Sequence, residues 1–255
     1  MTKIIINADD FGQTETCSKA IAQAFSENLI SSTTACANGD YIEQAFSLAR
    51  ESDFINKVGI HINLTDGKPL TDGIKNDAFF CENGEFHGHI NRLKKPTKQG
   101  LAEIKEEITA QIERLKSIGF NLTHADSHHH IHTDVYFINT IKDVLLSYGI
   151  NKIRLHRNFG DIKFYKKIIK CLYNNKLRKQ GFITTDKMGS TEDLEKYPEV
   201  VRTGICEIMV HPDFDKKGRL IDRVGWDEEG YPFGKELSEI KKYIKGLNPV
   251  SYKEL

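Results

Sequence analysis

The strongest constraint on the fold of this 255-residue chain is a regular alternation of short β-branched runs with amphipathic helical segments. Lys3 to Ala8 is followed by apolar residues at helical spacing over Thr14 to Asn28. Ile30 to Ala37 and Asp40 to Glu51 repeat the pattern. Strands that alternate with helices are typical of parallel sheets. We therefore predict an α/β fold, a TIM-like (β/α) barrel that is irregular and has about seven to eight strands.

The alternation continues to the C-terminus without internal repeats. A doubly wound open sheet is the alternative architecture. The barrel is favoured because polar residues lie at the C-terminal ends of several predicted strands, and these ends meet at one mouth in a barrel. Further strands are predicted over 58–64, 121–123, 152–155, 182–186, 205–210 and 250–252, and further helices over 99–118, 135–148, 163–178, 191–201 and 233–246.

One segment, at about 65–97, interrupts the alternation. Glycine and proline punctuate it, and it contains no long periodic stretch. A loop of this length is usually functional, often as a substrate-binding loop or lid. We therefore expect a single domain over residues 1–255 that carries one loop insertion.

The charge balance argues against a nucleic-acid or membrane partner. Lysine plus arginine equal aspartate plus glutamate at 36 each, and no basic stripe is present. The helix predicted over 163–178 is strongly basic, but a solvated face is favoured because neither an aromatic platform nor a glycine-rich loop accompanies it. The expected partner is a small molecule.

Three further features favour a cytoplasmic protein. The N-terminus enters a strand-like run at once, without the pattern of a secretion signal. No apolar run approaches the roughly 18 to 20 residues that cross a bilayer. The five cysteines are widely spread and lack CxxC spacing, which is typical of reduced thiols.

The most unusual local feature is the segment from His124 to His132, which holds five of the ten histidines together with Asp126. Histidine is the commonest metal ligand and changes charge near neutral pH. His128 and His132 come together whether the segment is extended or helical. A flexible surface tract or an affinity tag is the alternative, but the run directly follows a predicted strand.

Two adjacent carboxylates, Asp9 and Asp10, end the first predicted strand. They would repel each other in a dry site unless a cation lay beside them. One can then ligate a metal while the other accepts a proton from an attacking water, as expected of a hydrolase. The alternative is that an aspartate caps the following helix.

The other candidates also follow strands. His61 lies near the end of one strand, and His211, which follows the strand over 205–210, is a candidate general acid. Asp126 is expected to orient one of the cluster histidines by accepting its second N–H. An aspartate with two histidines leaves positions open on a metal, as catalysis requires. This mixed ligand set suits Zn²⁺ or another transition metal better than Mg²⁺.

Four ordered motifs together resemble one family. They are Asn7 to Gly12, Gly59 to Thr65, Asp126 to His132 and Val210 to Pro212. They resemble the YdjC-like carbohydrate deacetylases, which include the chitooligosaccharide (diacetylchitobiose) deacetylases, and the match runs from Lys3 to the end of the chain.

The resemblance implies a βα-barrel enzyme that removes the acetyl group from an N-acetylated sugar and uses a divalent metal, often described as magnesium. Carried onto this sequence, it makes Asp10, His61 and His128 the metal ligands, Asp9 the catalytic base and His211 the acid.

Other residues are assigned by position. His130 and His132 are expected to face substrate or to tune the attacking water, and Arg154 to bind substrate or to support the ligands. The aromatic surface for the sugar ring is expected from the insertion, through Phe79, Phe80 and Phe86.

Two other functions remain open at this stage. A phosphoesterase or amidohydrolase on a similar barrel would need cations near the mouth, for which Arg154, Arg157 and Lys68 are the candidates. A non-catalytic sugar-binding protein would use the same residues without turnover. The sequence also leaves the oligomeric state open, with a homodimer as one alternative.

Overall fold

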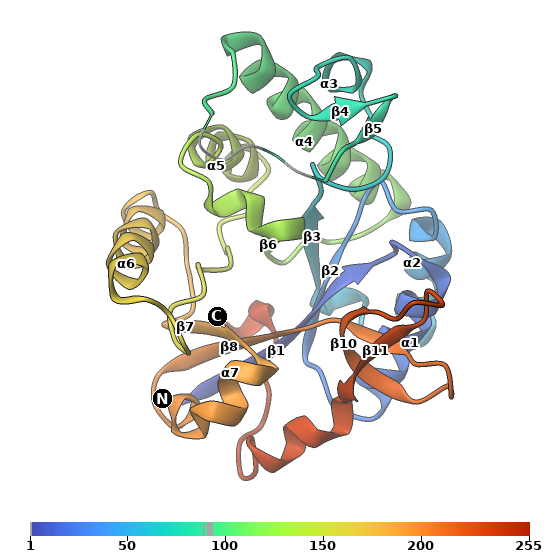
Figure 1. Cartoon of the computed structure of the whole chain (residues 1–255), viewed down its shortest axis with the longest axis vertical. Coiled ribbons are helices and arrows are strands. Elements are labelled where there is room, and N and C mark those ends of the chain that lie inside the picture. Colours follow the sequence, from blue (N-terminus) through green and yellow to red (C-terminus); the bar gives the residue numbers. More distant parts are fainter. Residues whose placement is uncertain (1, 89, 91–93) are drawn as a thin grey trace.

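A parallel six-stranded sheet forms the centre of the molecule in the computed structural model, which describes residues 2–88, 90 and 94–255 (Figure 1). The strands lie in the order β6-β3-β2-β1-β8-β7, so β1 is central. The α/β class is confirmed. The sheet curls into a half-barrel, and the described residues do not pair into a complete ring of ladders. The strands are β1 (Lys3–Phe11), β2 (Ser32–Ala35), β3 (Val58–Ile62), β6 (Ala125–Ser127), β7 (Lys187–Ser190) and β8 (Ile205–Val210).

Pairing beyond β6 is reduced to single bridges. The predicted strands over 152–155 and 182–186 contribute only the parallel bridges Ala125↔Ile153 and Lys152↔Ile183. Each apolar run is too short for a ladder, because a strand needs several consecutive paired residues. The segment after β6 therefore continues the curl of the sheet without regular strands, and it delivers Arg154 to the interior.

Helices connect the parallel strands, as the alternation predicted (Figure 1). Thr14 caps α1 by accepting a hydrogen bond from the backbone N–H of Cys17, and Gly119 ends α4 in a left-handed conformation with φ 118°. The residues of α6 are mostly exposed, in line with the predicted solvated face. The helices are α1 (Glu15–Ser26), α2 (Ile42–Glu51), α3 (Asp72–Lys75), α4 (Lys98–Ile118), α5 (Ile138–Ser147), α6 (Phe164–Lys179) and α7 (Thr191–Lys196).

The insertion is partly ordered by its own secondary structure. It contains α3 and a short hairpin of β4 (Cys81–Glu82) and β5 (Glu85–Phe86), while residues 89 and 91–93 lie outside the described part. Phe80 and Phe86 are buried in the hydrophobic core, and Phe79 packs against it. The expectation that these rings face a sugar is wrong, because Phe80 and Phe86 bury their apolar surface in the core and Phe79 packs against it.

The C-terminal third departs most from prediction. The helix expected over 233–246 is wrong: β9 (Pro212–Phe214), β10 (Leu220–Trp226) and β11 (Pro232–Glu236) form an antiparallel sheet, and only the short 3-10 helix η4 (Leu237–Lys242) remains. A Cβ on Gly234 would lie 1.9 Å from the carbonyl oxygen of Asp222, so this glycine permits close approach of the two strands.

The predicted closing strand over 250–252 is also wrong. Tyr252–Glu254 is a 3-10 helix, η5, and a single bridge, Ile4↔Pro249, is what pairs with the sheet there. Ser251 caps this turn and prevents further extension, because its side chain and that of Glu254 satisfy each other's backbone N–H groups.

One buried cluster of apolar side chains runs through the strands and the inner faces of the helices. Among the described residues, none of the helices has the length and apolar character needed to span a bilayer.

Candidate active site

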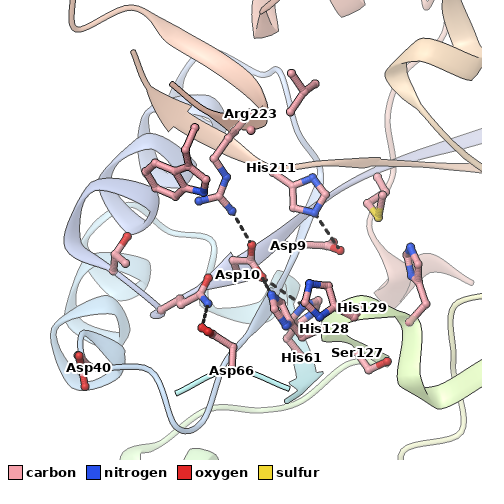
Figure 2. A pocket seen from close by; sticks show the side chains of 17 residues that line it. Asp9, Asp10, Asp40, His61, Asp66, Ser127, His128, His129, His211 and Arg223 are labelled. Atoms are coloured by element: carbon pink, nitrogen blue, oxygen red, sulfur yellow. Dashed lines mark hydrogen bonds and ion pairs between the residues drawn. The ribbon is translucent and has the colours of Figure 1, made fainter. Parts of the chain in front are cut away.

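The end of β1 presents two adjacent carboxylates to one pocket. Successive side chains of a regular strand point to opposite faces. Here the register with β2 shifts between Ala8 and Phe11, and Asp10 has a left-handed backbone with φ 69°. As a result both Asp9 and Asp10 line the same cavity (Figure 2). A left-handed aspartate costs free energy, and such strain is concentrated at functional sites.

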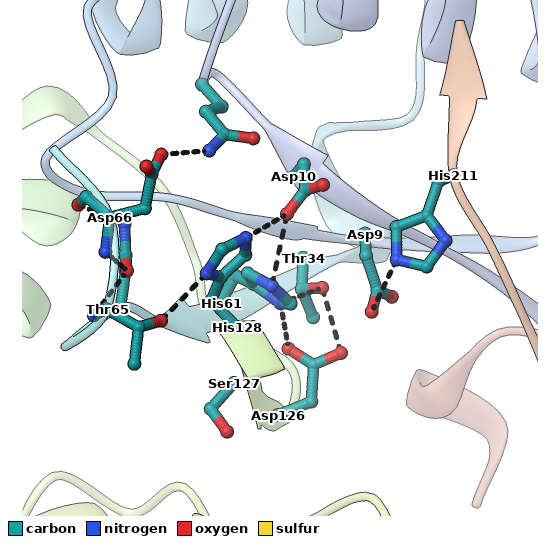
Figure 3. A network of polar contacts seen from close by, with 12 residues as sticks. Asp9, Asp10, Thr34, His61, Thr65, Asp66, Asp126, Ser127, His128 and His211 are labelled. Atoms are coloured by element: carbon teal, nitrogen blue, oxygen red, sulfur yellow. Dashed lines mark hydrogen bonds and ion pairs between the residues drawn. The ribbon is translucent and has the colours of Figure 1, made fainter. Parts of the chain in front are cut away.

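A cluster of metal-ligand type forms around Asp10 (Figure 3). Its Oδ1 lies 3.3 Å from Nε2 of His61 and 3.9 Å from Nε2 of His128. This oxygen is buried and has no hydrogen-bond partner. Buried carboxylate oxygens are normally satisfied, so an orphan that faces two imidazole nitrogens is the arrangement expected of a cation site. The residues present therefore fit a divalent metal.

Each imidazole is oriented by its other nitrogen. Nδ1 of His61 lies 2.7 Å from Oδ1 of Asp126, and Nδ1 of His128 lies 2.8 Å from Oγ1 of Thr65 (Figure 3). Thr34 also donates a hydrogen bond to Asp126. Such contacts hold the tautomer that leaves Nε2 free for a metal. Asp126 was expected to orient a cluster histidine; it orients His61 instead, because β3 and β6 pair these two residues directly.

The pKa values of the two imidazoles are shifted in opposite directions. Burial alone would lower the pKa of His61, but Asp126 and the other surrounding carboxylates raise it to about 10. Burial lowers the pKa of His128 to about 4. The negative charge around His61 thus attracts one positive charge, and a divalent cation bound at Nε2 would displace the proton.

Other potential ligand atoms lie close by. Those of Asp10, Cys36 and His61 all fall within 4.8 Å of one another, as do those of Asp9, His61 and Asp126. The Cys36 thiol is fully buried and does not line the pocket, and burial raises its pKa, so a metal would have to displace its proton in the absence of water. Asp9 and Asp126 are occupied by other partners. His128 lines the open pocket and is therefore the better third ligand.

Asp9 is held by a fully buried arginine. Arg154 donates from Nη1 and Nη2 to the two carboxylate oxygens at 2.6 Å each, and it also pairs with Asp126 and Glu207. Burial alone would raise the pKa of Asp9, but the Arg154 guanidinium holds it well below its usual range. Asp9 therefore remains a carboxylate at any working pH.

His211 lines the pocket next to Asp9. Its Nε2 lies 3.9 Å from Oδ2 of Asp9, and its side chain is 31% exposed (Figure 2). Asp222 accepts a hydrogen bond from its backbone N–H. His211 follows β8 directly and so is aimed at the pocket while remaining accessible from solvent.

The histidine cluster divides into pocket and structural residues. After β6 the chain forms η2 (His128–Thr133), in which His129 and His130 have left-handed backbones. Both line the pocket with His128. His132 is fully buried between Ser127 Oγ and the carbonyl of Arg154, and so lies behind the pocket rather than in it.

The cavity has a volume of about 750 Å³ and an acidic rim that includes Asp40 and Asp66. The three cationic residues predicted from the sequence, Arg154, Arg157 and Lys68, do not line this cavity. Arg154 is fully buried among carboxylates, while Arg157 pairs with Asp193 and Lys68 with Glu85. Among the described residues the lining therefore lacks an uncommitted lysine or arginine, which gives no support to a phosphoester substrate.

Several site residues were not anticipated. Glu207 interrupts the apolar run of β8, and Asn7 interrupts that of β1. A polar residue within a predicted buried strand could therefore have identified both as site residues. Arg223 and Trp226 reach the pocket from β10. Their segment was not predicted as a strand, and no local pattern marks them.

A family model described as YdjC-like protein matches residues 3–238. The chain is 30% identical over 213 residues to a carbohydrate deacetylase of Oceanobacillus iheyensis, covering 83% of this chain and 86% of the relative. It is 31% identical to a carbohydrate deacetylase of Geobacillus stearothermophilus, with 82% of this chain and 79% of the relative covered.

Among solved structures, a protein of Enterococcus faecalis with the provisional name of a cellobiose-phosphate cleavage protein superimposes with a TM-score of 0.77. The overlap covers 99% of this chain and 98% of that protein at 24% sequence identity. This likeness establishes that the two share a fold.

Proposed function

The chain belongs to the YdjC-like family, and from this premise we propose that it is a metal-dependent hydrolase that removes the acetyl group from N-acetylated sugars. N-acetylglucosamine oligomers such as diacetylchitobiose are the proposed substrates. The relatives named carbohydrate deacetylase support a sugar as the substrate class and deacetylation as the reaction. The observation that carries the metal requirement is the orphaned Oδ1 of Asp10 between two imidazole nitrogens.

Asp10, His61 and His128 would hold one divalent cation, with Mg²⁺ favoured by the family resemblance and Zn²⁺ or another transition metal by the ligand types. Bound there, the cation would supply Lewis acidity at the acetamide carbonyl and toward water. These ligands come from three different strand ends, so the open side of the site faces the cavity.

Asp9 is the proposed base, and its environment defines how it acts. Because Arg154 lowers its pKa, Asp9 is a weak base that is always ionised. It can accept a proton from an attacking water only if the pKa of that water is also lowered. A bound metal would lower it, so a base with a low pKa requires a metal at this site. Arg154 also fixes the direction of both carboxylate oxygens.

His211 is the proposed acid. The C–N bond of the acetamide breaks when the leaving nitrogen gains a proton, and an imidazolium at the pocket wall can donate it. Its position 3.9 Å from Oδ2 of Asp9 places proton acceptor and donor on the same side of the site. The products are acetate and a free amino sugar.

Removal of metal tests the proposal. After exhaustive chelation we expect acetate release from diacetylchitobiose to fall to background, and single divalent metals added back to restore it. Metal content is measured by elemental analysis on the same samples. Full activity in chelated protein that is free of metal would refute the metal requirement, and absence of acetate release with every metal would refute the deacetylase assignment.

The third ligand is tested by a pair of substitutions. His128→Ala is expected to weaken metal affinity by more than about 100-fold, because it removes a direct ligand. Cys36→Ser should leave metal affinity within a few fold, because Cys36 is buried outside the cavity lining. Competition titration with a chromophoric chelator measures both. The reverse order of effects would make Cys36 the ligand.

A further inference from the structure

Trp226 is the only tryptophan of the chain, and it stands at the wall of the cavity. It ends β10, whose residues from Arg223 to Trp226 line the pocket. The residue is 54% exposed, so a large part of the indole surface is open to a ligand. Trp226 has no role in the proposed catalytic steps.

Arg223 fixes the indole relative to the candidate metal ligand. The guanidinium carbon lies 4.9 Å from the indole centroid, and Nη2 donates a hydrogen bond of 2.9 Å to Oδ2 of Asp10. Nη1 lies 3.3 Å from Oδ2 of Asp213. One arginine thus covers a face of the indole and ties it to Asp10, while the exposed fraction leaves indole surface open.

The remaining lining suits a polyhydroxylated molecule. An aromatic face packs against the apolar C–H face of a pyranose, and the ring hydroxyls then need polar partners at its edge. Asp40 and Asp66 present carboxylate oxygens and Gln13 an amide oxygen along the same cavity, and Gln13 Nε2 donates a hydrogen bond of 2.6 Å to Asp66. Its volume of about 750 Å³ lies within the usual range of roughly 300 to 1,000 Å³ for small-molecule sites and leaves room for more than one sugar ring.

We propose that Trp226 is the stacking platform for the sugar residue next to the acetylated ring that reacts, and that Arg223 aligns this platform with Asp10. The inference rests on the proposed deacetylase function and adds the residue that sets its preference for chain length. The reacting acetamide must reach the buried Asp10, whereas Trp226 is half exposed. A sugar ring stacked on Trp226 would therefore lie nearer to solvent than the ring that reacts.

Fluorescence provides a direct test, because the tryptophan emission of the intact protein comes from this residue alone. In an Asp9→Asn background, in which turnover is slow, we expect diacetylchitobiose to change the emission saturably. The apparent Kd should be at least about tenfold lower than for N-acetylglucosamine. Unchanged emission at disaccharide concentrations that saturate acetate release by the wild-type protein would overturn the inference.

Kinetics provide the second test. The ratio of kcat/KM for the disaccharide to that for the monosaccharide should fall about tenfold in Trp226→Ala, and by less in Trp226→Phe, which keeps an aromatic face and guards against a folding defect. Phe164→Ala is the matched control, since Phe164 is an exposed aromatic residue on α6, outside the cavity lining. An unchanged ratio in both Trp226 variants would refute the platform.

The two proposals can fail separately. A fluorescence response without acetate release from any acetylated sugar would retain the sugar platform and reject the deacetylase. Acetate release by the wild-type protein, with an unchanged chain-length preference in the Trp226 variants, would support the deacetylase and reject the sugar platform.

Discussion

Asp9→Asn is expected to lower kcat for acetate release by about 10²–10⁴-fold, the usual contribution of a positioned general base. The amide cannot take a proton from water at neutral pH. Metal content should persist, because the proposed ligands are Asp10, His61 and His128 and the two oxygens of Asp9 are bound to Arg154. Steady-state acetate assays and elemental analysis on the same preparation measure the two effects.

The control for this variant is Asp161→Asn. It makes the same change at an exposed carboxylate that pairs with Lys196 and lies outside the cavity lining. It should leave kcat within about twofold, because exposed ion pairs contribute little. Undiminished turnover in Asp9→Asn would remove Asp9 from the mechanism, and loss of metal together with activity would make Asp9 a support of the metal site instead.

Arg154→Met is expected to cause the largest loss of stability. It would leave Asp9, Asp126 and Glu207 buried without their shared cation. Breaking a buried ion pair by removing one partner costs about 3–5 kcal/mol. For a chain of this size that corresponds to a fall in Tm of roughly 6–20 °C. Thermal unfolding followed by circular dichroism, with metal removed, measures it.

Arg219→Met is the matched control, because Arg219 also pairs with two carboxylates but is 53% exposed. Its Tm should change by only a few degrees. Arg154→Lys should be intermediate, since a single ammonium keeps the charge but cannot donate to both oxygens of Asp9 in parallel. If Arg154→Met melted within two or three degrees of the wild type, the buried cluster would not depend on this guanidinium.

Much of the fold could be predicted because the relevant patterns are local. Helical spacing of apolar residues placed the long helix over 99–118 to within one residue of α4, and Gly119 marked its end. Strand-like runs identified most of the parallel sheet. The antiparallel sheet after β8 was missed. Its strands β10 and β11 show no regular alternation of buried and exposed residues, and they form by pairing with neighbouring strands of the same sheet.

The candidate site was predictable for the same reason, up to a limit. Parallel strands end at one edge, so residues that follow several strands meet there, and Asp9, Asp10, His61, His128 and His211 all line one cavity. The role of each neighbour was not predictable. Whether a histidine faces the pocket or the core depends on backbone turns that residue type does not encode.

Three contacts illustrate that limit. Left-handed residues in η2 turn His130 toward the cavity, while His132, two residues later, is buried behind it. Arg154 contacts Asp9 across 145 positions of sequence. Arg223 reaches Asp10 across 213 positions.

For this protein, sequence alone determined the α/β class, the family resemblance and the set of strand-end residues, because each depends on spacing within a short stretch of chain. The tertiary structure decided which carboxylate oxygen is left without a hydrogen-bond partner, which carboxylates share Arg154, and that the aromatic residue lining the cavity is Trp226 rather than a residue of the insertion. These features depend on burial and on contacts between distant segments, and both exist only once the chain has folded.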